Sequence, residues 1–371
     1  MGLLVQTVKK DMTMNEIQKI LNSGGYIIFE QATYDITQTL YLHSNTKLDL
    51  NGARLRQASD INHILLTYSD AETIEYEGVH DVCVFNGTIE GMGKYGSKIN
   101  LITLCHTRNI YLKNLNLVDV VEFHSLEINS SQNVKVEDCL FRGFNSTIDD
   151  DDFRESIQID HAIESALVVV PLGSPWYDGT PCENIVIDGC VFEKSSSRPT
   201  PSQCIGNHCQ VTGRKHSNIT IQNCTFNGGN QTNKGGSCIT IVDMENVKIL
   251  NNICTQYGRF VRVTTFSYTY GIDGKLETLL AEDGISRNVL IEGNSVVNPT
   301  GTYLSSGVYV SSQTGNHESI IVKENSFNRG DNTKMKYAVD MKYVNGGIVA
   351  DNDINDLVIN VSKTCNGVYQ A

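Results

Sequence analysis

The chain repeats one short phrase along most of its length. The phrase starts with Asn, alternates apolar with other residues, carries Asn, Cys or Leu at its seventh position and ends on an apolar residue. Alternation with period two is typical of a β-strand that has one buried face. Successive copies begin 24 to 51 residues apart, at Asp81, Asn109, Asn133, Asn184, Asn218, Asn246, Asn288, Ser319 and Gly346.

A single strand of this kind cannot bury its apolar face alone. Its copies must stack on one another, and stacked repeats of about 20 to 50 residues form a solenoid. The longer intervals are interpreted as coils that carry loop insertions or a decayed copy. We therefore predict an all-β solenoid, in which 1–371 is one domain because the core grows along an axis.

The seventh position of the phrase predicts internal ladders. Cysteine occupies it in three copies and asparagine in four later ones, at Cys139, Cys190, Cys224, Asn252, Asn294, Asn325 and Asn352. Stacked Asn side chains form hydrogen bonds along a ladder, whereas stacked Cys side chains are buried as small apolar groups. Eleven cysteines is also an odd number. We expect free thiols and a reducing compartment.

Charge and hydropathy limit the partners. The formal net charge is −13, which argues against a nucleic-acid-binding surface and favours a neutral or mixed-charge glycan. No apolar run approaches the roughly 20 residues of a membrane helix. The N-terminus has no long apolar core after its basic residues, so it does not match a standard signal peptide.

The ends of the chain differ from its middle. Thr13 can cap a short helix that reaches Leu21, with Ile17 and Ile20 on its apolar face and the glycine pair 24–25 ending it. Such a helix would cover the open end of the solenoid core. The predicted parts are an N-terminal cap over 1–25, coils over about 26–359, and a tail over 360–371.

The segment that follows the helix carries a family resemblance. GGYIIFEQATYDITQTLYLHSNTKLDLNGARLRQ resembles the entry of phage tailspikes, and the whole chain resembles the pectate-lyase-like right-handed parallel β-helix superfamily. The resemblance implies a single-stranded right-handed parallel β-helix and a polysaccharide or oligosaccharide partner. The lack of a standard signal peptide and the expected free cysteines fit a phage or prophage tail protein, a class that often forms homotrimers, and equally fit a bacterial cytoplasmic enzyme that acts on imported oligosaccharides.

A second row of strands precedes most copies of the phrase. Its members include SLEINS, SIQIDH, CIGNHC, FVRVTT and GVYVSS. With the apolar residues turned inward, two outward columns result. One column holds Glu127, Gln158, Gly206, Thr240, Arg262, Tyr309 and Asp340, and the other holds Asn129, Asp160, His208, Val242, Thr264, Ser311 and Lys342. We expect Glu127, Asp160, His208 and Arg262 to share one exposed face that binds a glycan.

Carboxylates on this face are the catalytic candidates. Asp160 is the first choice, and Glu127 lies one strand away in the other column, about 5–8 Å from it. Two carboxylates at that distance can hydrolyse a glycosidic bond, although the estimate leaves retention or inversion open. Glu155 opens the strand of Asp160 and is an alternative partner acid. His208 could carry a proton or orient a carboxylate.

Substrate-binding candidates surround these groups. Arg262 could hold a sugar carboxylate through two parallel hydrogen bonds. Tyr309 and Trp176 could stack on sugar rings. Asn129, Gln158 and His161 are expected to bind substrate from the same face, and His124 flanks it.

The polygalacturonases give a family comparison for the same place. They carry Asn-x-Asp, Asp-Asp and Gly-His-Gly on successive coils, where this chain has Glu127-Ile-Asn129, then Glu155 to Asp160, then Gly206-Asn-His208. The three motifs follow one another in a similar order, but their residues differ from those of the polygalacturonases. The resemblance therefore implies the location of the cleft, with Glu155, Asp160 and His208 at matching positions.

The leading hypothesis is a glycoside hydrolase that acts on a bacterial surface or pectin-like polysaccharide. The alternatives are a polysaccharide lyase, a glycan epimerase and a non-catalytic glycan-binding tailspike. No cofactor is expected. Calcium between the aspartates of 149–152 is a weaker hypothesis, since hard oxygen ligands suit that ion. In CIGNHC, strict alternation would point Cys209 away from His208, and no zinc-ligand spacing is found.

Overall fold

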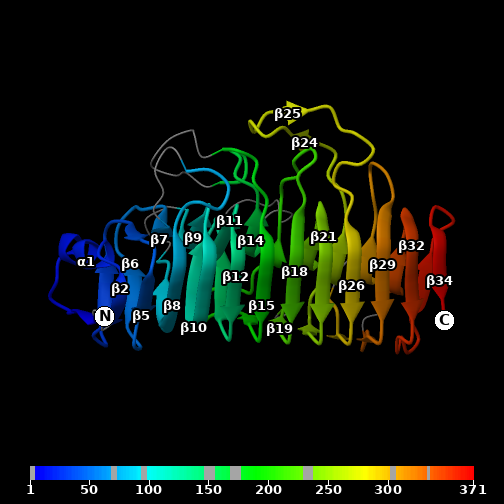
Figure 1. The fold of residues 1–371 in the computed structure, drawn as a ribbon. Coiled ribbons are helices and arrows are strands. Elements are labelled where there is room, and N and C mark those ends of the chain that lie inside the picture. The colour runs from blue at the N-terminus through cyan, green and yellow to red at the C-terminus, as the bar shows by residue number, and fades with distance from the viewer. Residues whose placement is uncertain are drawn as a thin grey trace.

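The chain winds into a stack of coils that build two long parallel sheets, and most coils add two strands to the larger sheet and one to the smaller (Figure 1). The computed structural model describes residues 5–67, 73–92, 98–145, 155–167, 177–228, 237–300, 306–331 and 335–371. Trp176 and the aspartates of 149–152 lie outside these residues, so their predicted roles stay predictions.

Sheet A contains the repeated phrase. In most coils a longer strand of this sheet carries the phrase, and a second strand of the same sheet follows it after a short turn, as β16 follows β15. The 21 strands are β1 Val5–Val8, β2 Gly25–Phe29, β3 Thr33–Ile36, β5 Thr46–Asp49, β6 Arg54–Gln57, β8 His80–Glu90, β10 Arg108–Val121, β12 Gln132–Glu137, β13 Leu140–Asn145, β15 Glu183–Asp188, β16 Val191–Glu193, β18 His216–Gln222, β19 Thr225–Asn227, β21 Met244–Leu250, β22 Ile253–Thr255, β26 Arg287–Glu292, β27 Ser295–Val297, β29 His317–Lys323, β30 Ser326–Asn328, β32 Val344–Ala350 and β34 Asn366–Gln370.

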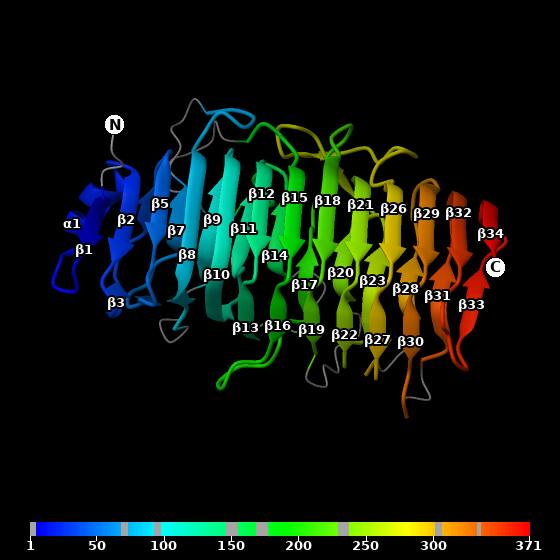
Figure 2. The ribbon, with the colours of Figure 1, turned by 60° about the horizontal axis from the view of Figure 1, so that its bottom comes forward.

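Sheet B is the second row of strands expected from the sequence, and Figure 2 shows its members side by side. Its 11 strands are β4 Leu40–Leu42, β7 His63–Thr67, β9 Asn100–Cys105, β11 Leu126–Asn129, β14 Glu155–Asp160, β17 Gln203–Gly206, β20 Ser237–Ile241, β23 Arg259–Val263, β28 Ser306–Val310, β31 Tyr337–Met341 and β33 Val358–Val361. A separate hairpin, β24 Thr269–Tyr270 and β25 Leu276–Glu277, lies at the top of Figure 1.

The register explains why the phrase repeats. Equivalent apolar residues of successive coils pair directly, as Ile110 does with Val134 and Val134 with Ile185, and all three are buried in one continuous core. A shift by one residue would turn every apolar side chain outward, so the alternating pattern holds the coils in register.

The leading asparagine of the phrase has a backbone reason. Asn133 and Asn184 have φ angles of 56° and 58°, in the left-handed region that Asn tolerates better than most residues. Their side chains form an outer ladder: Asn184 Nδ2 donates to Asn133 Oδ1 at 3.0 Å, and Asn133 Nδ2 donates to Asn109 Oδ1 at 3.1 Å.

The inner ladder at the seventh position is confirmed. Asn252 donates through its Nδ2 to Asn294 Oδ1 at 2.9 Å, and the same contact repeats from Asn294 to Asn325. In the earlier coils the thiols of Cys190 and Cys224 instead face backbone carbonyl oxygens. All eleven cysteines are free thiols, as expected.

The N-terminal cap is also confirmed. Helix α1 spans Met14–Leu21, and Thr13 and Glu16 form a reciprocal capping box at its start. Ile17 and Leu21 are fully buried against the first coil. The strand β1 before the helix was not expected.

The stretch predicted as a last partial coil and a tail over 360–371 contains one further strand. Strand β34 pairs with β32, and Cys365 and Val368 pack against the core, so this region forms the last half-coil. No helix among the described residues is long and apolar enough to cross a membrane.

Candidate functional site

Sheet B brings the two predicted columns into register. Glu127 pairs with Gln158 and Asn129 with Asp160, and Gln158 pairs with Gly206 on the next strand. Further along, Arg262 pairs with Tyr309. The register predicted for these residues is confirmed. Each coil contributes one strand to this sheet, so neighbouring strands have little freedom to slide past one another.

The start of several sheet B strands departs from strict alternation and gives a third outward position. On later strands the residue before the first inward residue is also in the core, as for Cys204, Cys238 and Phe260. Two adjacent residues therefore face inward, and the residue before them turns outward. Glu155 occupies this position in β14, and its side chain lies over Gly206, where a Cβ atom would be 3.2 Å from Glu155 Cγ.

Glu127 is held by donors from two strands. Asn129 Nδ2 donates to its Oε1 at 2.9 Å, Thr103 Oγ1 donates to its Oε2 at 3.1 Å, and Asn100 Nδ2 donates to the same oxygen. The side chain has no exposed surface. Glu127 is therefore fixed in orientation and closed to direct attack on a substrate.

Asp160 is also held by three hydrogen-bond donors. Its Oδ1 accepts a hydrogen bond from the His161 N–H at 3.0 Å, and its Oδ2 accepts from the His208 N–H at 3.1 Å and from Gln158 Nε2 at 3.2 Å. Burial acts to raise the pKa of Asp160, but the contacts with His161 and His208 outweigh it and lower the pKa. Asp160 is thus a fixed anion.

His208 lies between two acids. Its Nδ1 is 3.5 Å from Glu155 Oε2, and its Nε2 is 3.8 Å from Asp160 Oδ2. Burial acts to lower the pKa of His208, but the acids Glu155, Asp160 and Glu127 outweigh it and raise the pKa to about 9. The side chain retains 18% of its surface exposed, so it is the reachable member of the cluster.

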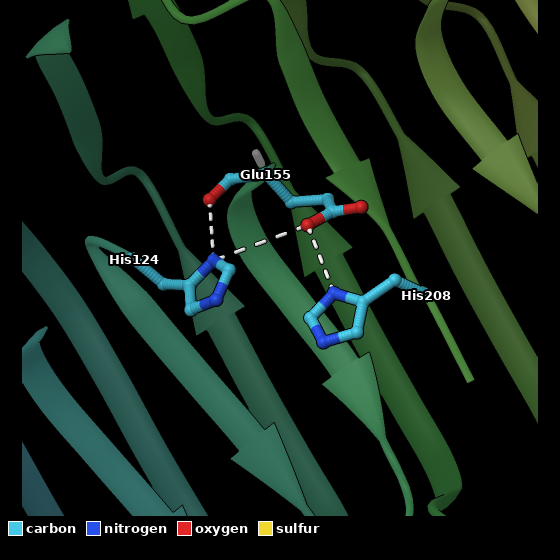
Figure 3. Close-up of side chains that lie close together, drawn as sticks. All are labelled: His124, Glu155 and His208. Carbon is cyan, nitrogen blue, oxygen red and sulfur yellow. Dashed lines mark hydrogen bonds and ion pairs between the residues drawn. The ribbon is translucent and has the colours of Figure 1, made fainter. Parts of the chain in front are cut away.

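Figure 3 shows Glu155 between two imidazoles. Its Oε2 lies 4.0 Å from Nδ1 of His124, on the side opposite His208, and the Glu155 carbonyl oxygen lies 2.8 Å from that same nitrogen. The rings of His124 and His208 are roughly parallel, with centroids 6.0 Å apart. Burial lowers the pKa of His124 to about 4, so this imidazole is neutral near pH 7.

The expectation of an exposed face was wrong for most of these side chains. Glu127, Asn129, Gln158, Asp160 and His161 have no exposed surface. One reason is the segment after β14, which folds back so that Gln158 Nε2 donates to the carbonyl oxygen of Ala166 at 3.0 Å.

His161 takes a supporting position behind Asp160. Its Nε2 faces the carbonyl oxygen of Arg214 at 3.0 Å, and its ring centroid is 4.0 Å from that of His216. Direct contact of His161 with a substrate, as predicted, does not fit this burial.

Arg262 and Tyr309 do not join the cluster. They lie on β23 and β28, three and four strands from β14. Tyr309 is flanked by cations, with Arg259 Cζ 4.5 Å and Lys342 Nζ 5.3 Å from its ring centroid. These residues therefore define a separate cationic and aromatic stretch along the same face.

Sequence reasoning missed Asn100, Thr103 and His216. The first two lie on β9, which precedes the copy of the phrase at Asn109, so the second-row pattern could have been extended one coil earlier. His216 opens β18, and no spacing signal ties it to His161. Strict alternation also failed for Cys209: β17 ends at Gly206, and one ligand atom each of Asp160, His208 and Cys209 lies within 4.8 Å of the others.

Comparisons with known proteins agree with this architecture. No family model matches the chain. A curated relative, plasmin and fibronectin-binding protein A of Streptococcus pneumoniae, is 27% identical over 231 residues, which cover 55% of this chain. The match spans only 31% of that relative's length.

Solved structures match over nearly the whole chain. The surface protein and adhesin PfbA of Streptococcus pneumoniae has a TM-score of 0.73 at 19% identity, covering 98% of this chain and 97% of its own. The tailspike of E. coli bacteriophage HK620 has a TM-score of 0.62 at 15% identity, and the match covers 96% of this chain and 59% of the tailspike. The family 28 exopolygalacturonase of Yersinia enterocolitica has a TM-score of 0.57 at 12% identity, and the match covers 99% of this chain and 78% of the exopolygalacturonase. These similarities show the predicted fold, a right-handed parallel β-helix.

Proposed function

We propose that the chain is a polysaccharide-degrading enzyme, specifically a glycoside hydrolase whose reactive group is His208. One observation carries the proposal: a partly exposed imidazole lies between the buried acids Glu155 and Asp160, at 3.5 and 3.8 Å. Nothing in the packing of the core requires three buried carboxylates and this histidine together, and buried charges cost free energy unless they are paired.

The geometry suits transfer of one proton. His208 gives its proton to the glycosidic oxygen while the bond between that oxygen and the sugar breaks. Water then adds to the sugar and returns one proton to the imidazole. Glu155 and Asp160 stabilise the imidazolium before and after this step, and their negative charge also favours the positively charged sugar of the transition state. The carboxylates predicted as acid and base thus act through His208.

The substrate class follows from the rest of the face. Arg259 and Arg262 on β23 and Lys342, directly after β31, provide positive charge, and Tyr309 between them offers a stacking surface. Strands of a sheet lie about 4.8 Å apart, so a glycan that runs along the helix axis would contact His208 and Arg262 at once. This arrangement favours a polysaccharide that carries carboxylates, despite the net charge of −13.

A second candidate is a non-catalytic binding module. The full burial of Glu127, Glu155 and Asp160 favours it, because these acids can serve to fix the shape of the face. The Streptococcus pneumoniae relative is named for binding plasmin and fibronectin, and its solved structure is described as an adhesin. Both the adhesin and the tailspike support action at a cell or virion surface, and a homotrimer belongs to the tailspike alternative.

The test is product analysis on a panel of acidic and neutral bacterial and plant polysaccharides. Wild type should release reducing ends from an acidic polysaccharide without new ultraviolet absorbance, and Asp160→Asn should release far fewer. Ultraviolet-absorbing products would instead indicate the polysaccharide lyase considered from the sequence. Tight glycan binding without any product would favour the binding module.

A further inference from the structure

Glu155 is a buried carboxylate without a hydrogen-bond donor. The residue has no exposed surface, and neither Oε1 nor Oε2 accepts a hydrogen bond from the described residues. Glu127 and Asp160, in the same cluster, each accept three. The charge of Glu155 faces the imidazole of His208 at 3.5 Å, and its oxygens keep the capacity to accept a closer ligand.

The distances around Glu155 fit a metal ion. Its Oε2 is 3.5 Å from Nδ1 of His208 and 4.0 Å from Nδ1 of His124. Hydrogen bonds from N–H donors to oxygen are about 2.7–3.2 Å long, so both contacts are too long for them. Atoms that bind one metal at about 2.1 Å lie roughly 3.0–4.2 Å from each other, and both contacts fall in that range.

We infer that His124, Glu155 and His208 bind a first-row divalent transition metal ion. The three residues come from successive coils, and one ligand atom from each lies within 4.8 Å of the others. In the metal-free chain Nδ1 of His124 donates a hydrogen bond to the Glu155 carbonyl oxygen at 2.8 Å, and a bound ion would replace that proton. Figure 3 shows these groups directed toward one place.

The chemistry of the ligands selects the class of ion. Imidazole and carboxylate together suit zinc, iron, cobalt or nickel, whereas calcium and magnesium prefer sites made of oxygen alone. The exposed edge of His208 provides the route by which the ion enters. The metal site goes beyond the proposed hydrolysis and uses His208 in another state: a bound ion replaces the proton on Nδ1 of His124 and of His208, whereas proton transfer by His208 requires the metal-free chain.

Two neighbouring groups of similar residues do not fit a metal. In the group Asp160, His161 and His216, the His216 Nδ1 accepts the N–H of Cys182 at 2.9 Å, so the other nitrogen of its ring carries the proton and has no lone pair. The group Asp160, His208 and Cys209 differs from the proposed site in its carboxylate, because both oxygens of Asp160 are taken by hydrogen bonds whereas those of Glu155 are not. Asp160 already accepts three hydrogen bonds in both groups.

The experiment measures Zn²⁺ binding by titration calorimetry and Co²⁺ binding by visible absorption on the metal-stripped chain. Wild type should bind one ion per chain, show cobalt absorption bands and unfold at a higher temperature with Zn²⁺. Glu155→Gln and His124→Gln should each weaken binding by more than about tenfold and remove the cobalt bands.

The matched control is His106→Gln. His106 is likewise buried with its Nδ1 against a carbonyl oxygen, that of Glu75, yet it belongs to none of the groups that could hold a metal. This variant should bind Zn²⁺ as wild type does. If wild type binds no ion, or if folded Glu155→Gln binds it as tightly as wild type, the inference is wrong. Hydrolysis plays no part in either readout, so failure of the proposed function leaves the result interpretable.

Discussion

The Glu155 side chain fills the space that a side chain at Gly206 would need: a Cβ atom on Gly206 would lie 3.2 Å from Glu155 Cγ and 3.3 Å from the Cβ of Thr240. The outward turn of Glu155 thus depends on a glycine in the next coil. The same relationship places the carboxylate between His124 and His208.

Gly206→Ala should therefore displace Glu155. We expect a loss of about 1–2 kcal/mol in the free energy of unfolding, since added atoms overpack the site, together with weaker Zn²⁺ binding. Urea denaturation measures the first effect. In a Glu155→Ala background most of the stability cost should vanish. An equal cost in both backgrounds would mean that Thr240, rather than Glu155, meets the new methyl group.

The inner asparagine ladder should be sensitive to interruption. Asn294 accepts the backbone N–H and the Nδ2 of Asn252 and donates to Asn325 and to the carbonyl oxygen of Ile249. Asn294→Ala leaves several of these groups buried without partners, so we expect a loss of about 2–4 kcal/mol in urea denaturation.

Asn294→Cys is the matched comparison, because Cys190 and Cys224 fill the equivalent position in earlier coils. Its thiol can face a backbone carbonyl, so it should cost less than alanine. If the two variants lose equal stability, the ladder does not stabilise the fold through side-chain hydrogen bonds.

The stability of the fold should fall in mild acid because of His317. Burial lowers the pKa of His317 to about 4, while Nδ1 accepts the Ser286 N–H and Nε2 faces the Ser311 carbonyl oxygen. In the unfolded chain this histidine has a pKa near 6.5, so between about pH 6.5 and 4 only the unfolded state takes up the proton. The folded state should lose about 3 kcal/mol across this window.

Unfolding free energies at several pH values test this point. His317→Gln can keep both hydrogen bonds and should show a shallower fall between pH 6.5 and 4. His80→Gln, which changes a partly exposed histidine, should follow wild type. Parallel curves for His317→Gln and wild type would exclude His317 as the cause.

The sequence was sufficient for the fold and the register because one pattern determines both. A strand that alternates and recurs once per coil pairs only with its own copies, so Glu127, Gln158 and Gly206 could be aligned without coordinates. The leading asparagines and the inner ladder follow from the same repetition.

The candidate site was predicted less completely, for reasons local to each residue. Simple alternation would turn Glu155 inward together with Ile157, yet the Glu155 side chain lies over Gly206 on the outer face. The burial of Asp160 and Gln158 depends on residues 161–167 folding back over them, which no periodicity encodes. The approach of His124 to Glu155 joins residues 31 apart, whose separation carries no recognisable motif.

The most direct test of the account is the rate of reducing-end release by His208→Gln, measured beside its glycan binding on the best polysaccharide of the panel. A proton-transferring histidine contributes about 100-fold or more to a rate. The account predicts a fall of that size with glycan binding retained, because Arg262 and Tyr309 lie on other strands. A rate equal to that of wild type would contradict the assignment of His208 as the reactive group.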